Sequence, residues 1–219
     1  MSHRALGPLT KMKKITYIFF VWFLACGLLH AQIVQQAVVN TPAPSGSGPV
    51  DCGNTAETAT LASNLNSPTG IPCTTGADAN GYTVTAFYTY TGAVAGTVYA
   101  AIYPDRTSGC GDGATHCANS TANCGDTAGF TPSATTWNED TAAAITTSCG
   151  TIAANTVIWL MTNYSSATTA VGHKTGACTA PTSSGYFTSV TAGTWPSLNG
   201  AGFNLDTNCY SNYVVLQPQ

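Results

Sequence analysis

YTVTAFYTYT, at Tyr82–Thr91, places polar and apolar side chains in alternation and contains no charged residue. Successive side chains of a β-strand point to opposite faces, so this period of two, with β-branched and aromatic residues, predicts a half-buried strand. The threonines and Phe87 fall on one face. The side chains predicted to share the other face are Tyr82, Val84, Ala86, Tyr88 and Tyr90.

The neighbouring segments continue this pattern. Gly92–Gly96 supplies a turn and Thr97–Tyr103 alternates again, so the two runs are predicted to form a hairpin that ends at Pro104. TVIWLMTNY, at Thr156–Tyr164, is apolar almost throughout and too short for a confident helix. This run predicts a central strand that is buried on both faces.

Shorter strand patterns recur along the chain, separated by turn residues. Strands are predicted over Tyr186–Val190 and Tyr210–Leu216, the second of which closes the domain by pairing with an early strand. Weaker candidates are strands at Thr135–Asn138, Ala142–Thr147 and Thr169–His173 and a helix at Thr55–Leu65. The pattern predicts an all-β fold, an antiparallel β-sandwich with the jelly roll as its favoured form.

The chain begins with features of an export signal. Three lysines precede the apolar run Ile15–Leu29, which is short for a membrane span. A small residue at Ala31 suits signal peptidase, so residues 1–31 are predicted to be a signal peptide, leaving no membrane span after cleavage. The alternatives are a retained membrane anchor and a lipoprotein modified at Cys26.

The remaining chain divides into two regions. Residues 32–51 include a Pro/Gly/Ser-rich stretch and are predicted to be a flexible linker. Residues 52–219 are long enough for one β-sandwich domain with a hydrophobic core.

Charge narrows the choice of partner. Beyond residue 31 there are nine acidic residues and two basic ones, Arg106 and Lys174, which gives a formal charge of −7. Such a chain cannot neutralise a row of phosphates, so no nucleic acid is expected as a partner. The surface, rich in threonine, serine and asparagine, suits a protein that is secreted or held at the cell surface.

Cysteine usage agrees with export. An even number of cysteines beyond the signal predicts up to four disulfides, whose connectivity the sequence does not reveal. A zinc site near His116 is the alternative, but it lacks a Cys-x2-Cys pair. The cysteines are Cys52, Cys73, Cys110, Cys117, Cys124, Cys149, Cys178 and Cys209.

Residues 104–134 contain three of these cysteines and few apolar residues, which predicts a long disulfide-rich loop on the surface. Asp105, Asp112 and Asp126 lie within it. A structural Ca²⁺ on these carboxylates is a possibility, but free surface aspartates are favoured, and no cofactor is expected.

Several segments, taken in chain order, resemble a known kind of module. They are Gly96–Asp105, Trp137-Asn138, Ala154–Leu160 and Trp195–Ser197. Over residues 80–216 the chain resembles the β-sandwich modules of secreted bacterial proteins, jelly rolls of the galactose-binding-like kind. The resemblance implies a bacterial extracellular or periplasmic protein that binds carbohydrate beside an enzyme or adhesin.

Catalysis is disfavoured. No Gly-x-Ser-x-Gly elbow is present, and most carboxylates lie in turn-like contexts rather than as a pair that could flank a glycosidic bond.

Sugar binding needs exposed aromatic rings. Trp137 and Trp159 lie in strand-like runs and are predicted to be core residues. Trp195 lies in a loop-like stretch, where it can plug the sandwich or serve as a stacking platform beside Tyr186 and Tyr210.

Three functions follow from these observations. The first is a non-catalytic binding module for an extracellular glycan or another surface polymer, with Trp195, Tyr186 and Tyr210 as its ligand-binding residues. The second is a structural or adhesive surface protein that self-associates. The third is a small secreted hydrolase.

The predicted signal peptide gives a testable prediction. We expect the secreted protein to begin at Gln32, because cleavage follows Ala31. Intact-mass spectrometry of protein from the culture medium or periplasm checks this prediction. A chain that retains its first 31 residues and stays with the membrane would contradict it.

Overall fold

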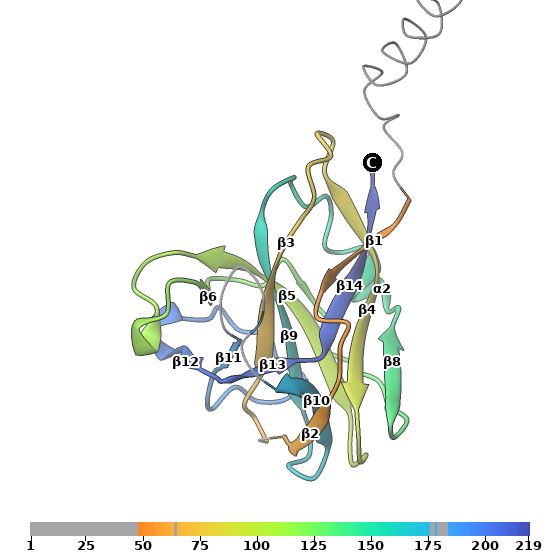
Figure 1. Cartoon of the computed structure of the whole chain (residues 1–219), viewed down its shortest axis with the longest axis vertical. Coiled ribbons are helices and arrows are strands. Elements are labelled where there is room, and N and C mark those ends of the chain that lie inside the picture. Colours follow the sequence, from red (N-terminus) through yellow and green to blue (C-terminus); the bar gives the residue numbers. More distant parts are fainter. Residues whose placement is uncertain (1–47, 64, 176–177, 179–183) are drawn as a thin grey trace, which may run out of the picture. The chain divides into compact units, whose positions relative to one another are not determined.

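The computed structural model describes residues 48–63, 65–175, 178 and 184–219, and the predicted signal peptide lies outside them. Two antiparallel β-sheets pack together in this region (Figure 1). No helix in the described ranges is long and apolar enough to cross a membrane. The first strand begins at Val50, so the last two residues of the predicted linker belong to the sandwich.

Sheet A consists of two rows of strands joined along β4. One row consists of β1 (Val50–Gly53), β14 (Asn212–Pro218), β4 (Tyr82–Thr91) and β8 (Thr136–Asp140). The other consists of the end of β4, β10 (Ala170–Thr175), β2 (Ala59–Ala62) and β13 (Asn208–Tyr210).

Sheet B has β9 at its centre. Its strands are β12 (Asn204–Leu205), β11 (Gly185–Tyr186), β3 (Thr69–Thr74), β9 (Val157–Tyr164) and β5 (Val98–Arg106), with β6 (Cys117–Ala118) and β7 (Cys124–Gly125) paired to β5. The helical turns are η1 (Gly111–Gly113), α2 (Ala143–Thr146) and η2 (Gly200–Gly202).

Eight of these strands have the order of a jelly roll. Numbered along the chain, they are β1, β3, β4, β5, β7, β8, β9 and β14. In this numbering, the strands that lie side by side in sheet A are the first, eighth, third and sixth. Those in sheet B are the second, seventh, fourth and fifth. Two interlocked Greek keys give this arrangement, which confirms the predicted sandwich and its favoured form.

Strand β9 is buried on both faces, as its sequence predicts. Ile158 and Leu160 point into the main core between the sheets, where they meet Phe87 of β4. Trp159 and Met161 point away from sheet A into a second apolar cluster. Full burial of each large side chain contributes about 1.5–3 kcal/mol, so both clusters hold β9 at the centre.

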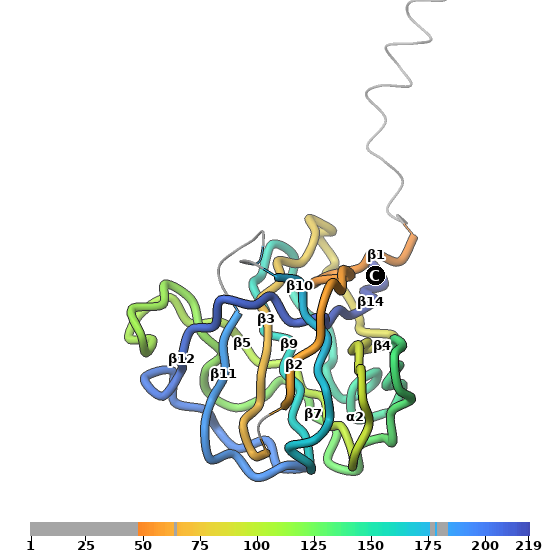
Figure 2. Tube along the Cα trace, turned by 60° about the horizontal axis from the view of Figure 1, so that its bottom comes forward, coloured from red at the N-terminus to blue at the C-terminus, as the bar shows by residue number. Residues whose placement is uncertain are grey.

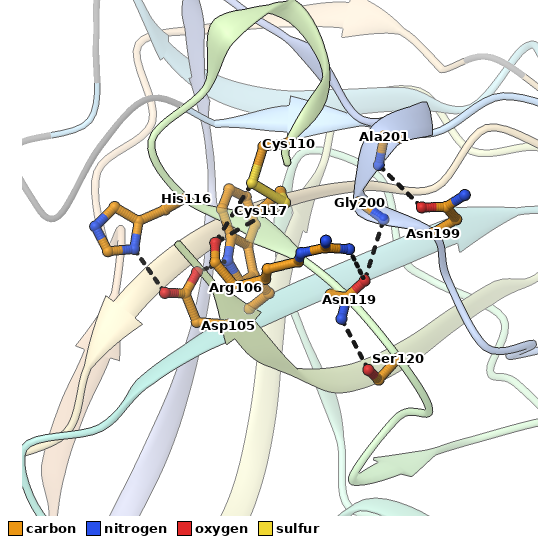
Figure 3. Close-up of a disulfide and its surroundings, with 11 residues drawn as sticks. Asp105, Arg106, Cys110, His116, Cys117, Asn119, Ser120, Asn199, Gly200 and Ala201 are labelled. Atoms are coloured by element: carbon orange, nitrogen blue, oxygen red, sulfur yellow. Dashed lines mark hydrogen bonds and ion pairs between the residues drawn. A yellow bond between two sulfur atoms is a disulfide. The ribbon is translucent and has the colours of Figure 1, made fainter. Parts of the chain in front are cut away.

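Two segments, 107–123 and 187–203, form a loop layer over the outer face of sheet B. Ser120 and Leu198 join them through a pair of backbone hydrogen bonds. Asn119 Oδ1 accepts hydrogen bonds from Arg106 and from the backbone of Gly200, which fixes the layer to β5 (Figure 3). The predicted surface loop at 104–134 is therefore largely a core-covering layer, and it contains β6 and β7.

All eight predicted cysteines form disulfides. The pairs are Cys52–Cys73, Cys110–Cys117, Cys124–Cys149 and Cys178–Cys209. The first connects β1 of sheet A with β3 of sheet B, and the second closes within the loop layer. Since such bonds persist in oxidising compartments, they fit a protein that works outside the cytosol.

Several predicted elements differ from the structure. Within Thr55–Leu65 the predicted helix is replaced by β2, whose β-branched Thr60 suits its pairing with β10. The segment Ala142–Thr147 contains α2 rather than a strand. Its one buried side chain is Ile145, which a single helical turn is enough to direct into the core. Of Tyr186–Val190, only Tyr186 belongs to a strand.

The predicted hairpin is also wrong. β4 lies in sheet A and β5 in sheet B, so the connection between them crosses the sandwich. β5 continues past Pro104 to Arg106, because the carbonyl of Pro104 still accepts a hydrogen bond from Asn119. The last predicted strand divides at Ser211, where the chain changes its partner from β10 to β4. Its pairing with early strands, β1 and β4, is as predicted.

The disulfide between the sheets gives a stability prediction. Replacing Cys52 and Cys73 by serine should lower the free energy of unfolding by about 3 kcal/mol, because the unfolded chain regains the freedom that the closed loop removes. Urea unfolding of the oxidised protein measures this loss. An unchanged midpoint would contradict it, and peptide mapping under non-reducing conditions checks the four pairs themselves.

Candidate functional site: an aromatic face on sheet A

A β-bulge in β4 decides which side chains reach the surface. Val84 pairs with Leu216 while Ala86 pairs with Val215, so Thr85 is an extra residue on β4. A bulge of this kind shifts the alternation by one position. The predicted common face therefore breaks at Thr85.

Beyond the bulge, the inward and outward positions are exchanged. Phe87, Thr89 and Thr91 are buried between the sheets, whereas Tyr88 and Tyr90 are half-buried on the outer face. The predicted common face is therefore wrong beyond Thr85, and the two tyrosines lie on the side of sheet A that faces away from sheet B.

Four rings from three strands gather on this outer face, and together we call them the aromatic face: Tyr88, Tyr90, Trp137 and Tyr213. Tyr88 and Tyr213 are cross-strand partners whose rings stack with centroids 4.7 Å apart and planes 8° apart. Trp137 meets Tyr213 edge-to-face at 5.0 Å and Tyr90 at 5.7 Å. Such contacts, each worth about 0.5–1.5 kcal/mol, hold the rings in fixed positions.

Strand β10 leaves room for this arrangement. The ring of Tyr90 lies against Gly172, and a Cβ at that position would come 2.6 Å from Tyr90 Cδ1. A larger residue at 172 would push the Tyr90 ring away from the sheet. The glycine is therefore part of what shapes the aromatic face.

Two exposed carboxylates flank the stacked tyrosines. Glu139 of β8 is the cross-strand partner of Tyr88, and Asp51 of β1 pairs with Val215, two residues from Tyr213. Burial raises the pKa of the Tyr88 phenol, and Glu139 raises it further. Burial also raises the pKa of Tyr213, followed by the charges of Asp51 and Glu139. Both carboxylates therefore act on the same ring pair.

This arrangement has the chemistry of a sugar-binding surface. The C–H face of a pyranose packs on an aromatic ring, and carboxylate oxygens accept hydrogen bonds from hydroxyl groups. The rings lie on the open face of a sheet that strands β8, β4 and β14 build side by side (Figure 1).

The residues predicted from the sequence to bind a ligand do not form one site. Trp195 packs on Gly125, its Nε1 donates to the carbonyl of Asp126 at 2.8 Å, and its ring meets Tyr103 edge-to-face. It is thus a half-buried plug of the loop layer. Tyr210 is 2% exposed and is hydrogen-bonded through its hydroxyl to Asp206, so it cannot stack on a ligand.

Tyr186 lies apart from both the other predicted ligand-binding residues and the aromatic face. It is half-buried on β11, at the opposite side of the molecule from β4 (Figures 1 and 2). Trp159 is a core residue as predicted, but Trp137 is half-exposed and belongs to the aromatic face. The missed signal was the alternation in β8, where Trp137 and Glu139 point outward on either side of the buried Asn138.

A second polar cluster lies beside the Cys110–Cys117 disulfide. Asp105 accepts a hydrogen bond from Trp159 Nε1 at 2.8 Å, and its other oxygen lies 2.6 Å from His116 Nδ1. Figure 3 shows Ser120 on the opposite side of Arg106 from His116, so these residues do not form a serine–histidine pair. Within the described ranges, no three potential metal ligands come together.

Two aspartates of the predicted 104–134 loop have protein partners. Asp112 accepts from the backbone of Leu205, which joins η1 to β12. Asp126 accepts from the backbone of Ala128 and Gly129, as is typical of a carboxylate that stabilises its own turn.

Comparison with known proteins gives no relative. No protein family, no curated protein and no solved structure matches this chain.

The carboxylate beside Tyr88 gives a titration prediction. In Glu139→Gln the pKa of the Tyr88 phenol should fall toward its ordinary value, because a negative charge that opposes ionisation is removed. NMR titration of isotope-labelled tyrosine measures the shift. Asp112→Asn, on the loop layer, is the matched control and should leave Tyr88 unchanged. Equal titration curves in both variants would place Glu139 away from the ring.

Proposed function

We propose that this protein is a non-catalytic binding module for an extracellular carbohydrate polymer, and that the aromatic face is its binding surface. The observation that carries the proposal is the contiguous set of four partly exposed rings between two carboxylates. Sequence resemblance to secreted sugar-binding jelly rolls supports the same class of ligand.

The contrast between the two sheets supports this surface. The outer face of sheet B is covered by the loop layer, which buries Tyr103 and Trp159 of the sheet together with its own Phe203. The outer face of sheet A has no such cover among the described residues, and it keeps large rings partly open to solvent. Contiguous apolar patches with a polar rim mark binding surfaces, and here the rim is acidic.

The polar neighbours of the rings suit hydroxyl-rich ligands. Thr83, Thr85 and Gln217 lie on the same outer side of sheet A. The hydroxyls of Thr83 and Thr85 donate to backbone carbonyls of β14, and the side-chain amide of Gln217 keeps a second N–H that complements the acceptor-only carboxylates. This mixture favours a sugar over a purely apolar partner.

Substitution of the tryptophan tests the proposal. Trp137→Ala should weaken binding to the glycan that the protein recognises by about 30-fold, which is what a binding hot spot of about 2 kcal/mol contributes. Trp195→Ala is the matched control: it also removes an indole, but from the loop layer. Glycan-array screening identifies the ligand, and calorimetry measures both variants.

The outcomes separate the candidate functions. We expect Trp137→Ala to lose glycan binding, and we expect Trp137→Phe and Trp195→Ala to retain it. Loss with Trp195→Ala alone would move the site to the residue favoured by the sequence. If the protein binds no glycan but forms dimers, and if Trp137→Ala dissociates these dimers, then the aromatic face contacts a second copy of the chain.

A further inference from the structure

The two carboxylates beside the aromatic face form no ion pair among the described residues. Asp51 and Glu139 are exposed, and the one ion pair among the described residues joins His116 and Asp105 elsewhere. They approach the stacked Tyr88 and Tyr213 from opposite flanks, one from β1 and the other from β8. The rings therefore lie between two negative charges.

The rest of the chain offsets little of this charge. Of the two basic residues beyond the predicted signal, Arg106 of β5 donates to Asn119, whereas Lys174 of β10 lines a pocket with Asp51 but forms no ion pair among the described contacts. With a formal charge of −7 for residues 32–219, the domain repels polyanions and attracts cations.

Aromatic rings strengthen this selection. The faces of tryptophan and tyrosine attract a cation through their negative π-clouds, by about 0.5–1 kcal/mol at an exposed site. A carboxylate close to the same ring adds a direct charge interaction and hydrogen-bond acceptors. A neutral sugar can use the stacking and the hydrogen bonds of its hydroxyl groups, whereas a sugar with a protonated amine adds the cation–π attraction and the charge interaction.

We infer that the aromatic face selects a glycan with protonated amino groups, such as a glucosamine polymer, over the same polymer in its N-acetylated form. This inference rests on the proposed function and names its substrate class. Acetylation removes the positive charge of the amine while leaving the sugar ring and its linkage unchanged. The two forms therefore differ mainly in the interaction with Asp51, Glu139 and the ring faces.

Calorimetry on the exported chain tests the inference with two probes of equal length, fully deacetylated and fully acetylated β-linked glucosamine oligosaccharides, at mildly acidic pH. The deacetylated probe should bind about tenfold more tightly at low salt, from two charge contacts and cation–π attraction. High salt should reduce this ratio, because the contacts are exposed and screened.

Matched variants assign the preference to the site. The pair Asp51→Asn and Glu139→Gln should bring the ratio of the two affinities close to one. The pair Asp78→Asn and Asp112→Asn removes the same charge from a turn and from the loop layer, and should keep the ratio.

Each outcome has a distinct meaning. Equal affinity for both probes, lost in Trp137→Ala, would overturn the amine preference and leave the proposed function standing. Binding of the deacetylated probe that Trp137→Ala leaves intact would reduce the effect to general charge attraction and overturn the inference. Binding of neither probe, with another glycan bound through Trp137, would overturn the inference alone, whereas no glycan binding at all would overturn both.

Discussion

The double-sided burial of β9 is the constraint on which the rest of this structure depends. From Ile158 to Tyr164 every residue is buried, so the strand needs an apolar partner on each side of sheet B. Sheet A provides one partner, and the loop layer provides the other. A strand buried in this way is unusual in a two-layer sandwich, where outer faces ordinarily meet water. The cysteine-rich segment after β5 exists, in physical terms, to complete this burial.

Covering sheet B on its outer face leaves sheet A as the open side of the sandwich. There the side chains are free to serve a ligand, provided that the sheet is held firmly from beneath. Val84, Phe87 and Val214 pack into the main core directly under the aromatic face, and the Cys52–Cys73 disulfide ties its edge strand to sheet B. The rings therefore project from a rigid support, which limits the entropy lost when a ligand binds.

Sequence patterns predicted the strongly periodic elements. They failed where contacts between distant parts of the chain determine which way a side chain points. β9 was predictable because its apolar run is continuous, and the disulfides were predictable because the cysteines beyond residue 31 are even in number. The bulge at Thr85 left only one mark in Tyr82–Thr91, the apolar Phe87 on the face of the threonines. That one extra residue moved Tyr88 and Tyr90 to the surface, and with them the candidate site. Trp195, by contrast, lies in a loop-like sequence, yet it finds an acceptor and a glycine to pack against.

The bulge also explains why stacking and charge coincide at one place. Without it, Tyr88 would point inward, and Glu139 of the neighbouring strand would stand beside a different residue on the outer face. With it, the register sets Glu139 opposite Tyr88 and Tyr213 on the other flank of the same ring, with Asp51 one strand further. Neither carboxylate forms an ion pair among the described residues, and the phenols beside them stay protonated at neutral pH because their pKa values are raised. Residues that a fold does not need for its own stability, yet holds in a fixed relation, are the ones that a ligand can use.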